Sequence, residues 1–138
     1  MTSPLELFCD RSLGHHKVPD RLRQVHSAVI AHDDVFAQDT DDEVWLKIAG
    51  ECGWVVLTRD DRIRYRPSEQ RALIEAGTAV FCLNPSKGMT AEEWAEAFVA
   101  ALPKILTTVA KNPSGGYIMG VNRNGKLRHL FPKSPVAG

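Results

Sequence analysis

The chain lacks a net charge of either sign, since its 138 residues carry 17 basic and 17 acidic side chains. A uniformly basic surface for nucleic acid is therefore excluded, although local basic patches are not. The three cysteines include no CxxC pair, which argues against a disulfide framework or a zinc site. No secretory signal opens the chain, and the longest apolar-rich stretch, near Ala97–Ala110, is too short to span a bilayer. These absences predict a cytoplasmic protein with reduced thiols and no membrane association.

Apolar runs and helical patterns alternate along the chain. Runs typical of buried strands are Leu5–Asp10, Ala28–Ala31, Trp54–Thr58 and Ala79–Leu83. Segments with helical signals lie between and after them, at about residues 19–26, 41–52, 67–76 and 91–111. Strands and helices in this order form a mainly parallel sheet with helices on both faces. The predicted fold class is therefore α/β, a single domain of three layers.

Local signals predict how two of these segments begin and end. Thr40, with Glu43 three positions later, has the pattern of a capping box at a helix start. Asn122–Gly125, flanked by Tyr117–Val121 and Lys126–Leu130, predicts a β-hairpin. The expected organisation is a domain over residues 1–111, a C-terminal hairpin over 112–131 and a disordered tail over 132–138.

Carboxylates lie where the predicted strands end. Asp10 ends the first strand, and Asp60 follows the Trp54–Thr58 strand. Asp41 and Asp42 begin the helix that leads into that strand, and a helical wheel does not separate them. Sites in such sheets usually lie beyond the carboxyl ends of the strands, where grouped carboxylates favour a hard divalent cation, Mg²⁺ or Mn²⁺. Such an ion can activate water and stabilise the charge on a phosphate.

Three segments carry a resemblance to a known family: Phe8–Gly14, Gln38–Arg64 and Ala79–Leu83. They resemble the PIN-like nucleases, especially the VapC-type toxins of bacterial toxin–antitoxin pairs, over about residues 5–110. The resemblance implies a PIN-like fold and an endoribonuclease that cleaves RNA with Mg²⁺ or Mn²⁺. It also implies a cognate antitoxin as partner, and a homodimer.

The resemblance also assigns the site residues. Matched one position at a time, the catalytic and metal-binding residues are Asp10, Asp42 and Asp60. Asp42 is preferred over Asp41 because apolar or small residues follow it three and seven positions later. A fourth acidic residue, two positions beyond the third in this family, would fall on an arginine here. Asp61 is the nearest candidate, and the fourth carboxylate stays open.

Basic side chains near these carboxylates are the candidates for holding RNA phosphates. We assign this role to Arg11, Arg62 and Arg64. Two other functions compete with the nuclease. A phospho-accepting receiver domain would need an acidic pair after the first strand, whereas the pair Asp33–Asp34 follows the second. A catalytically inactive PIN-like module that binds proteins is the other, with the hairpin as a docking surface.

Overall fold

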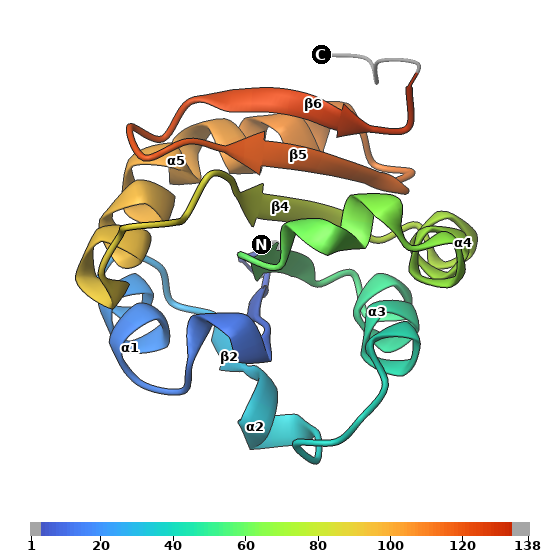
Figure 1. Ribbon diagram of the computed structural model, residues 1–138, viewed down its shortest axis with the longest axis horizontal. Coiled ribbons are helices and arrows are strands. Elements are labelled where there is room, and N and C mark those ends of the chain that lie inside the picture. The colour runs from blue at the N-terminus through green and yellow to red at the C-terminus, as the bar shows by residue number, and fades with distance from the viewer. Residues whose placement is uncertain (1–3, 134–138) are drawn as a thin grey trace.

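The computed structural model describes residues 4–133 as one six-stranded sheet with helices on both faces (Figure 1). The strands are β1 (Leu7–Cys9), β2 (Val29–Ala31), β3 (Val55–Thr58), β4 (Ala79–Leu83), β5 (Tyr117–Val121) and β6 (Leu127–Phe131). Their order is β2-β1-β3-β4-β5-β6, with β6 antiparallel to β5 and every other pair parallel. The predicted α/β class and mainly parallel sheet are confirmed. Of the predicted tail, residues 134–138 lie outside the described residues.

The helices form the two outer layers. They are α1 (Lys17–Arg23), α2 (His32–Val35), α3 (Asp42–Glu51), α4 (Pro67–Ala76) and α5 (Ala91–Lys111), with 3₁₀ segments η1 (Arg11–Leu13) and η2 (Asp61–Tyr65). Helices α1 and α5 cover one face of the sheet, and α3 and α4 cover the other (Figure 1). Within residues 4–133, no helix has the length and apolar character that crossing a membrane requires.

Strand β1 is buried on both of its faces. Leu7 and Cys9 pack into the core beneath α1 and α5, whereas Phe8 packs into the core beneath α3 and α4. The Phe8 ring stacks on Trp54 with 5.5 Å between centroids, and all three β1 side chains are fully buried. Successive side chains of a strand point to opposite faces, and both faces of β1 are covered by helices. The end of β1 therefore lies within the core. The next residue, Asp10, is therefore buried at the sheet edge, with 6% of its surface exposed.

The start of α3 differs from the prediction. The helix begins at Asp42, and its N-cap is Asp41, which has an extended backbone and makes no side-chain capping bond. Arg11 Nη1 donates a hydrogen bond to the Thr40 carbonyl at 3.1 Å, so this residue is held outside the helix. The predicted capping box of Thr40 and Glu43 is wrong.

The C-terminal hairpin is confirmed, and it continues the central sheet. The Asn122 side-chain oxygen accepts hydrogen bonds from the backbone N–H groups of Asn124 and Lys126, at 2.8 and 3.0 Å. Gly125 has a φ of 81°, and a Cβ there would lie 2.7 Å from the Cβ of Ala100 on α5, so the turn requires glycine. Strand β5 pairs in parallel with β4. The division of the chain at residue 111 stays a prediction.

Candidate active site

Asp10 is the most buried carboxylate at the carboxyl edge of the sheet. Its Oδ1 accepts hydrogen bonds from the backbone N–H and the hydroxyl of Ser12, at 2.9 and 2.5 Å. Its Oδ2 accepts a hydrogen bond from the Thr58 hydroxyl at 2.7 Å. Burial raises the pKa of Asp10 to about 6, and the negative charge of Asp42 adds to the rise, although the bonds from Ser12 and Thr58 oppose it. The three hydrogen bonds fix the direction of both carboxylate oxygens.

Thr58 links the ends of β1 and β3. Its hydroxyl donates to Asp10 and also accepts a hydrogen bond from the backbone N–H of Asp60 at 3.0 Å. Asp60 in turn begins η2, where its Oδ1 accepts from the backbone N–H of Arg62 at 3.2 Å. Because β1 and β3 are neighbouring parallel strands, one buried threonine holds the two carboxylate-bearing ends in register. This contact explains the Thr-x-Asp pattern at the end of β3 in physical terms.

Asp42 reaches the same edge from the first turn of α3. Its Oδ1 accepts hydrogen bonds from the indole N–H of Trp45 at 2.9 Å and from Arg11 Nη2 at 2.5 Å. Its Oδ2 lies 3.5 Å from Nη1 of Arg66. Trp45 is itself buried against β1 through Phe8, so the indole fixes the direction of the carboxylate. Asp41 instead serves as the N-cap residue and is exposed.

A fourth carboxylate, Glu69, joins the cluster from the first turn of α4. Arg66 Nη1 lies 3.2 Å from Asp60 Oδ2 and 3.2 Å from Glu69 Oε2, so one guanidinium contacts Asp42, Asp60 and Glu69 together. Burial raises the pKa of Glu69, and the charges of Asp42 and Asp60 add to the rise against the opposing effect of Arg66. We call Asp10, Asp42, Asp60 and Glu69 the carboxylate cluster. Asp61, the candidate suggested by sequence, instead lines a cleft beside it.

The carboxylate cluster suits a cation that binds oxygen. Among residues 4–133, no three His, Cys, Asp or Glu side chains form a ready-made metal cage. Arg66 nevertheless places a positive group among three of the carboxylates, which shows that the site accommodates a cation. All the donors are carboxylate oxygens, the ligands that Mg²⁺ and Mn²⁺ prefer. The residues present therefore fit a hard divalent ion.

The three predicted RNA-binding arginines lie in different surroundings. Arg11 binds Asp42 and the carbonyl groups of Gln38 and Thr40. Arg64 stacks its guanidinium 4.7 Å from the ring centroid of Tyr65. Arg62 is the most open of the three, with 73% of its side chain exposed beside Asp60. Of the three, Arg62 is therefore the best placed to meet a ligand from solvent, and Arg11 is placed to orient Asp42.

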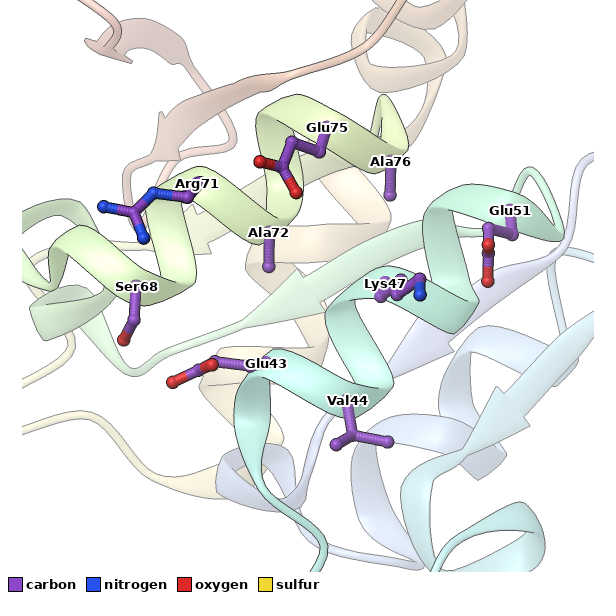
Figure 2. Close-up of a pocket in the computed structure, with 9 residues that line it drawn as sticks. All are labelled: Glu43, Val44, Lys47, Glu51, Ser68, Arg71, Ala72, Glu75 and Ala76. Carbon is purple, nitrogen blue, oxygen red and sulfur yellow. The ribbon is translucent and has the colours of Figure 1, made fainter.

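A second hollow lies between α3 and α4, away from the carboxylate cluster. Figure 2 shows its lining, in which Glu43 and Lys47 come from α3, and Ser68 and Arg71 come from α4. Glu43 is next to Asp42 in the chain but points into this groove. Successive helical residues are about 100° apart, so neighbouring carboxylates serve different surfaces. The groove has a volume of about 480 Å³.

Glu69 and the role of Arg66 carry no signal in the sequence that marks them as functional. Glu69 occupies the first turn of a helix that begins with Pro67, where an acidic residue is already favoured by the helix dipole. Its position therefore carried no separate signal of function. Only the packing of α4 against α3 brings Glu69 to Asp42. Arg66 stands in the same basic stretch as Arg62 and Arg64, and such a stretch is typical of a solvated surface.

Comparisons with known proteins identify relatives of this chain. A family model described as "PIN like domain" matches residues 5–85. A curated protein of Mycobacterium tuberculosis, "Putative ribonuclease VapC45", is 32% identical over 128 residues, which cover 90% of this chain and 91% of the relative. No solved structure gives a significant match.

Proposed function

This chain belongs to the PIN-like domain family, and from that membership we propose that it is a metal-dependent endoribonuclease, the toxin of a toxin–antitoxin pair. The observation that carries the proposal is the carboxylate cluster, in which Asp42, Asp60 and Glu69 meet around the Arg66 guanidinium. Thr58 links the fourth carboxylate, Asp10, to the backbone of Asp60. Buried like charges repel one another. A protein that keeps them together needs a cation at that point, and the relative's printed name is that of a ribonuclease.

Asp10, Asp42 and Asp60 are the residues that would hold the ion. When bound there, Mg²⁺ or Mn²⁺ supplies a Lewis acid for the scissile phosphate and lowers the pKa of a water molecule. Ser12 and Thr58 keep Asp10 oriented by donating to both of its oxygens. The Oδ2 atom of each of these three carboxylates accepts one hydrogen bond and so keeps a lone pair for a further ligand.

Glu69 and Arg66 have separate roles in this proposal. Glu69 is buried and has a raised pKa, which suits a group that accepts a proton from the attacking water. Arg66 neutralises the cluster in the free protein, and its guanidinium can also meet a phosphate, which it binds in the same geometry as a carboxylate. Arg11 holds Asp42 in place.

The partners follow from the same family membership. We propose a cognate antitoxin, which would act in the cytoplasm and block the carboxylate cluster, and RNA held through Arg62 with Arg11 and Arg64 nearby. A homodimer stays a prediction. The apolar stripe on α5 is not free to form it, because Phe98, Leu102 and Ile105 are buried in the core.

Neither alternative function gains support from the geometry. Asp33 and Asp34 lie in α2, where they bind His32, His15 and Arg23, and a receiver domain would need such a pair beside Asp10. The four-membered carboxylate cluster is more than an inactive binding module requires.

The test is cleavage of a mixed RNA pool by the purified chain. We expect fragments in the presence of Mg²⁺ or Mn²⁺ and none after chelation with EDTA. Asp10→Asn keeps the shape of the side chain, so circular dichroism should show an unchanged fold while cleavage stops. Equal cleavage with and without chelator would contradict the metal-dependent mechanism, and no cleavage under any condition would contradict the nuclease.

A further inference from the structure

Beside the carboxylate cluster lies a cleft in which the residues after β4 have no role in the proposed mechanism. It has a volume of about 570 Å³ and runs between η2 and the loop that follows β4. Asp60 forms part of its wall, so the cleft opens directly from the cluster. Arg62 lies on the η2 side, and Asn84, Ser86 and Lys87 lie on the β4 side. A strand bound across the carboxylates would continue into this space.

Asn84 is the unusual member of this wall. It follows β4 directly, and its backbone N–H donates to the Val121 carbonyl at 2.9 Å, which fixes its position against β5. Only 9% of the residue is exposed, and its side-chain Nδ2 has no hydrogen-bond partner among residues 4–133. Buried amide N–H groups are nearly always paired, because leaving one unpaired costs free energy. Asn84 therefore carries, at the wall of the cleft, a buried side-chain donor that lacks an acceptor.

The charges around Asn84 indicate what the acceptor is. Lys87 lies exposed three residues further along the same loop, and Arg62 faces the cleft with 73% of its side chain exposed. A third cation of the cleft, Arg59, stacks on Trp94, and Arg62 also pairs with Asp60. Cations together with a neutral donor suit a phosphate oxygen, which is anionic and a strong acceptor. The carboxylates Asp60 and Asp61 occupy the η2 wall, so the phosphate is favoured on the Asn84 and Lys87 side. Within the described part of the chain, no aromatic ring lines the cleft, and stacking on aromatic rings is how proteins commonly hold the bases of a single strand.

We infer that this cleft is a subsite for a phosphodiester that neighbours the scissile one, with the Asn84 amide donating to a phosphate oxygen and Lys87 and Arg62 neutralising its charge. The inference rests on the proposed ribonuclease function and names how the substrate strand is held. Asn84 strengthens the binding of RNA. Because it contacts the sugar–phosphate backbone of the RNA, this effect is independent of the base sequence.

The experiment measures RNA binding by fluorescence anisotropy, with short fluorescein-labelled single strands of oligo(U), oligo(A) and oligo(C). The Asp10→Asn background prevents cleavage during the titration. Asn84→Asp replaces the donor with an anionic acceptor at nearly constant shape and should weaken binding about 10-fold or more for all three strands. Lys87→Ala, on the exposed loop, should weaken binding several-fold. It should also reduce the slope of the logarithm of the binding constant against the logarithm of salt concentration by about one. Lys111→Ala, at the end of α5 and away from the cleft, is the matched control and should bind as the parent does.

Several outcomes would overturn the inference. If the parent cleaves RNA while both Asn84→Asp and Lys87→Ala bind all three strands as tightly as the background protein, the subsite is wrong and the proposed function stands. A loss with Asn84→Asp that is confined to one base would show that the amide reads a base edge, which also contradicts the inference. A parent that neither binds nor cleaves RNA would overturn both. Lys87→Ala keeps the test valid should Asn84→Asp fail to fold.

Discussion

Two acidic regions occupy the same edge of the sheet and differ in almost every physical respect. The carboxylate cluster follows β1 and β3, and the pair Asp33–Asp34 follows β2. Asp10 is 6% exposed, and its burial raises its pKa to about 6. The side chain of Asp34 is 43% exposed, and a hydrogen bond from His15 lowers its pKa. Position at a strand end thus does not decide how a carboxylate behaves.

The difference lies in what covers each region. Strand β2 is the outermost strand of the sheet. The residues that follow it therefore remain in water, where histidine and arginine side chains pair with them. Strands β1 and β3 lie inside, between the layers formed by the helices. Removing a charge from water is costly unless it is paired. Arg66 neutralises only part of the cluster, because it does not contact the buried Asp10. A metal ion can compensate the remaining charge, whereas the Asp33–Asp34 pair already has histidine and arginine partners.

The largest expected effect separates the two regions by activity. Asp10→Asn should lower metal-dependent RNA cleavage by about 100-fold or more, because loss of a group that merely supports a metal ligand already costs about 10–100-fold. Asp34→Asn should cleave like the parent. Single-turnover cleavage with matched circular dichroism spectra checks this. Equal losses in the two variants would remove the distinction between the regions.

The second effect concerns stability against pH in EDTA. The pKa of Asp10 is raised in the folded chain, so the folded state binds the proton more tightly than the unfolded state does. Stability from protonated Asp10 is fully present below its ordinary pKa of 3.8 and is lost as the pH rises through about 6. The corresponding difference is about 3 kcal/mol at neutral pH.

Asp10→Asn, which stays neutral, should therefore gain stability relative to the parent as the pH rises from about 4 to about 7. Urea unfolding at each pH measures this gain. Asp34→Asn should show a small effect of opposite sign. The lowered pKa of Asp34 means that its carboxylate stabilises the fold at pH values above the ordinary pKa, and this stability is lost as the pH falls. A constant difference between Asp10→Asn and the parent would mean that ionisation of Asp10 costs nothing.

The third effect tests the carboxylate that the sequence did not reveal. Glu69→Gln should slow cleavage by about 10-fold or more, since general base catalysis contributes at least about 100-fold in typical enzymes and water can partly replace the base. Glu43→Gln, in the groove of Figure 2, is the matched control and should leave cleavage unchanged. An unchanged rate in Glu69→Gln would limit the site to three carboxylates.

The smallest effect concerns the two arginines that neutralise the regions. Arg66→Ala should lower the free energy of unfolding without metal by about 1 kcal/mol, a moderate value because the Arg66 side chain is 32% exposed. The corresponding fall in melting temperature is about 4 °C. Millimolar Mg²⁺ should restore part of it, since the ion replaces the missing positive charge. Arg23→Ala, beside Asp34, should show no such rescue, and an equal rescue in both would contradict a specific cation site.

The sequence alone identified two members of the cluster because of how strands end. Apolar runs that stop at a carboxylate predicted Asp10 and Asp60 on one edge of the sheet, and the structure brings both to Thr58. The same local reasoning failed at Thr40, where a capping pattern is present but Arg11 holds the Thr40 carbonyl outside the helix. That contact spans 29 positions of the chain, so no local pattern reveals it.

The sequence by itself determined the α/β class, most segment boundaries and the carboxylates that end strands, because these depend on periodicity and on neighbouring residues. Only the tertiary structure decided which further groups join them. Packing of α4 on α3 brings Glu69 and Arg66 to Asp42, and pairing of β4 with β5 fixes Asn84. Burial and the absence of a partner are properties of the whole fold, because they depend on which distant segments exclude water from a side chain.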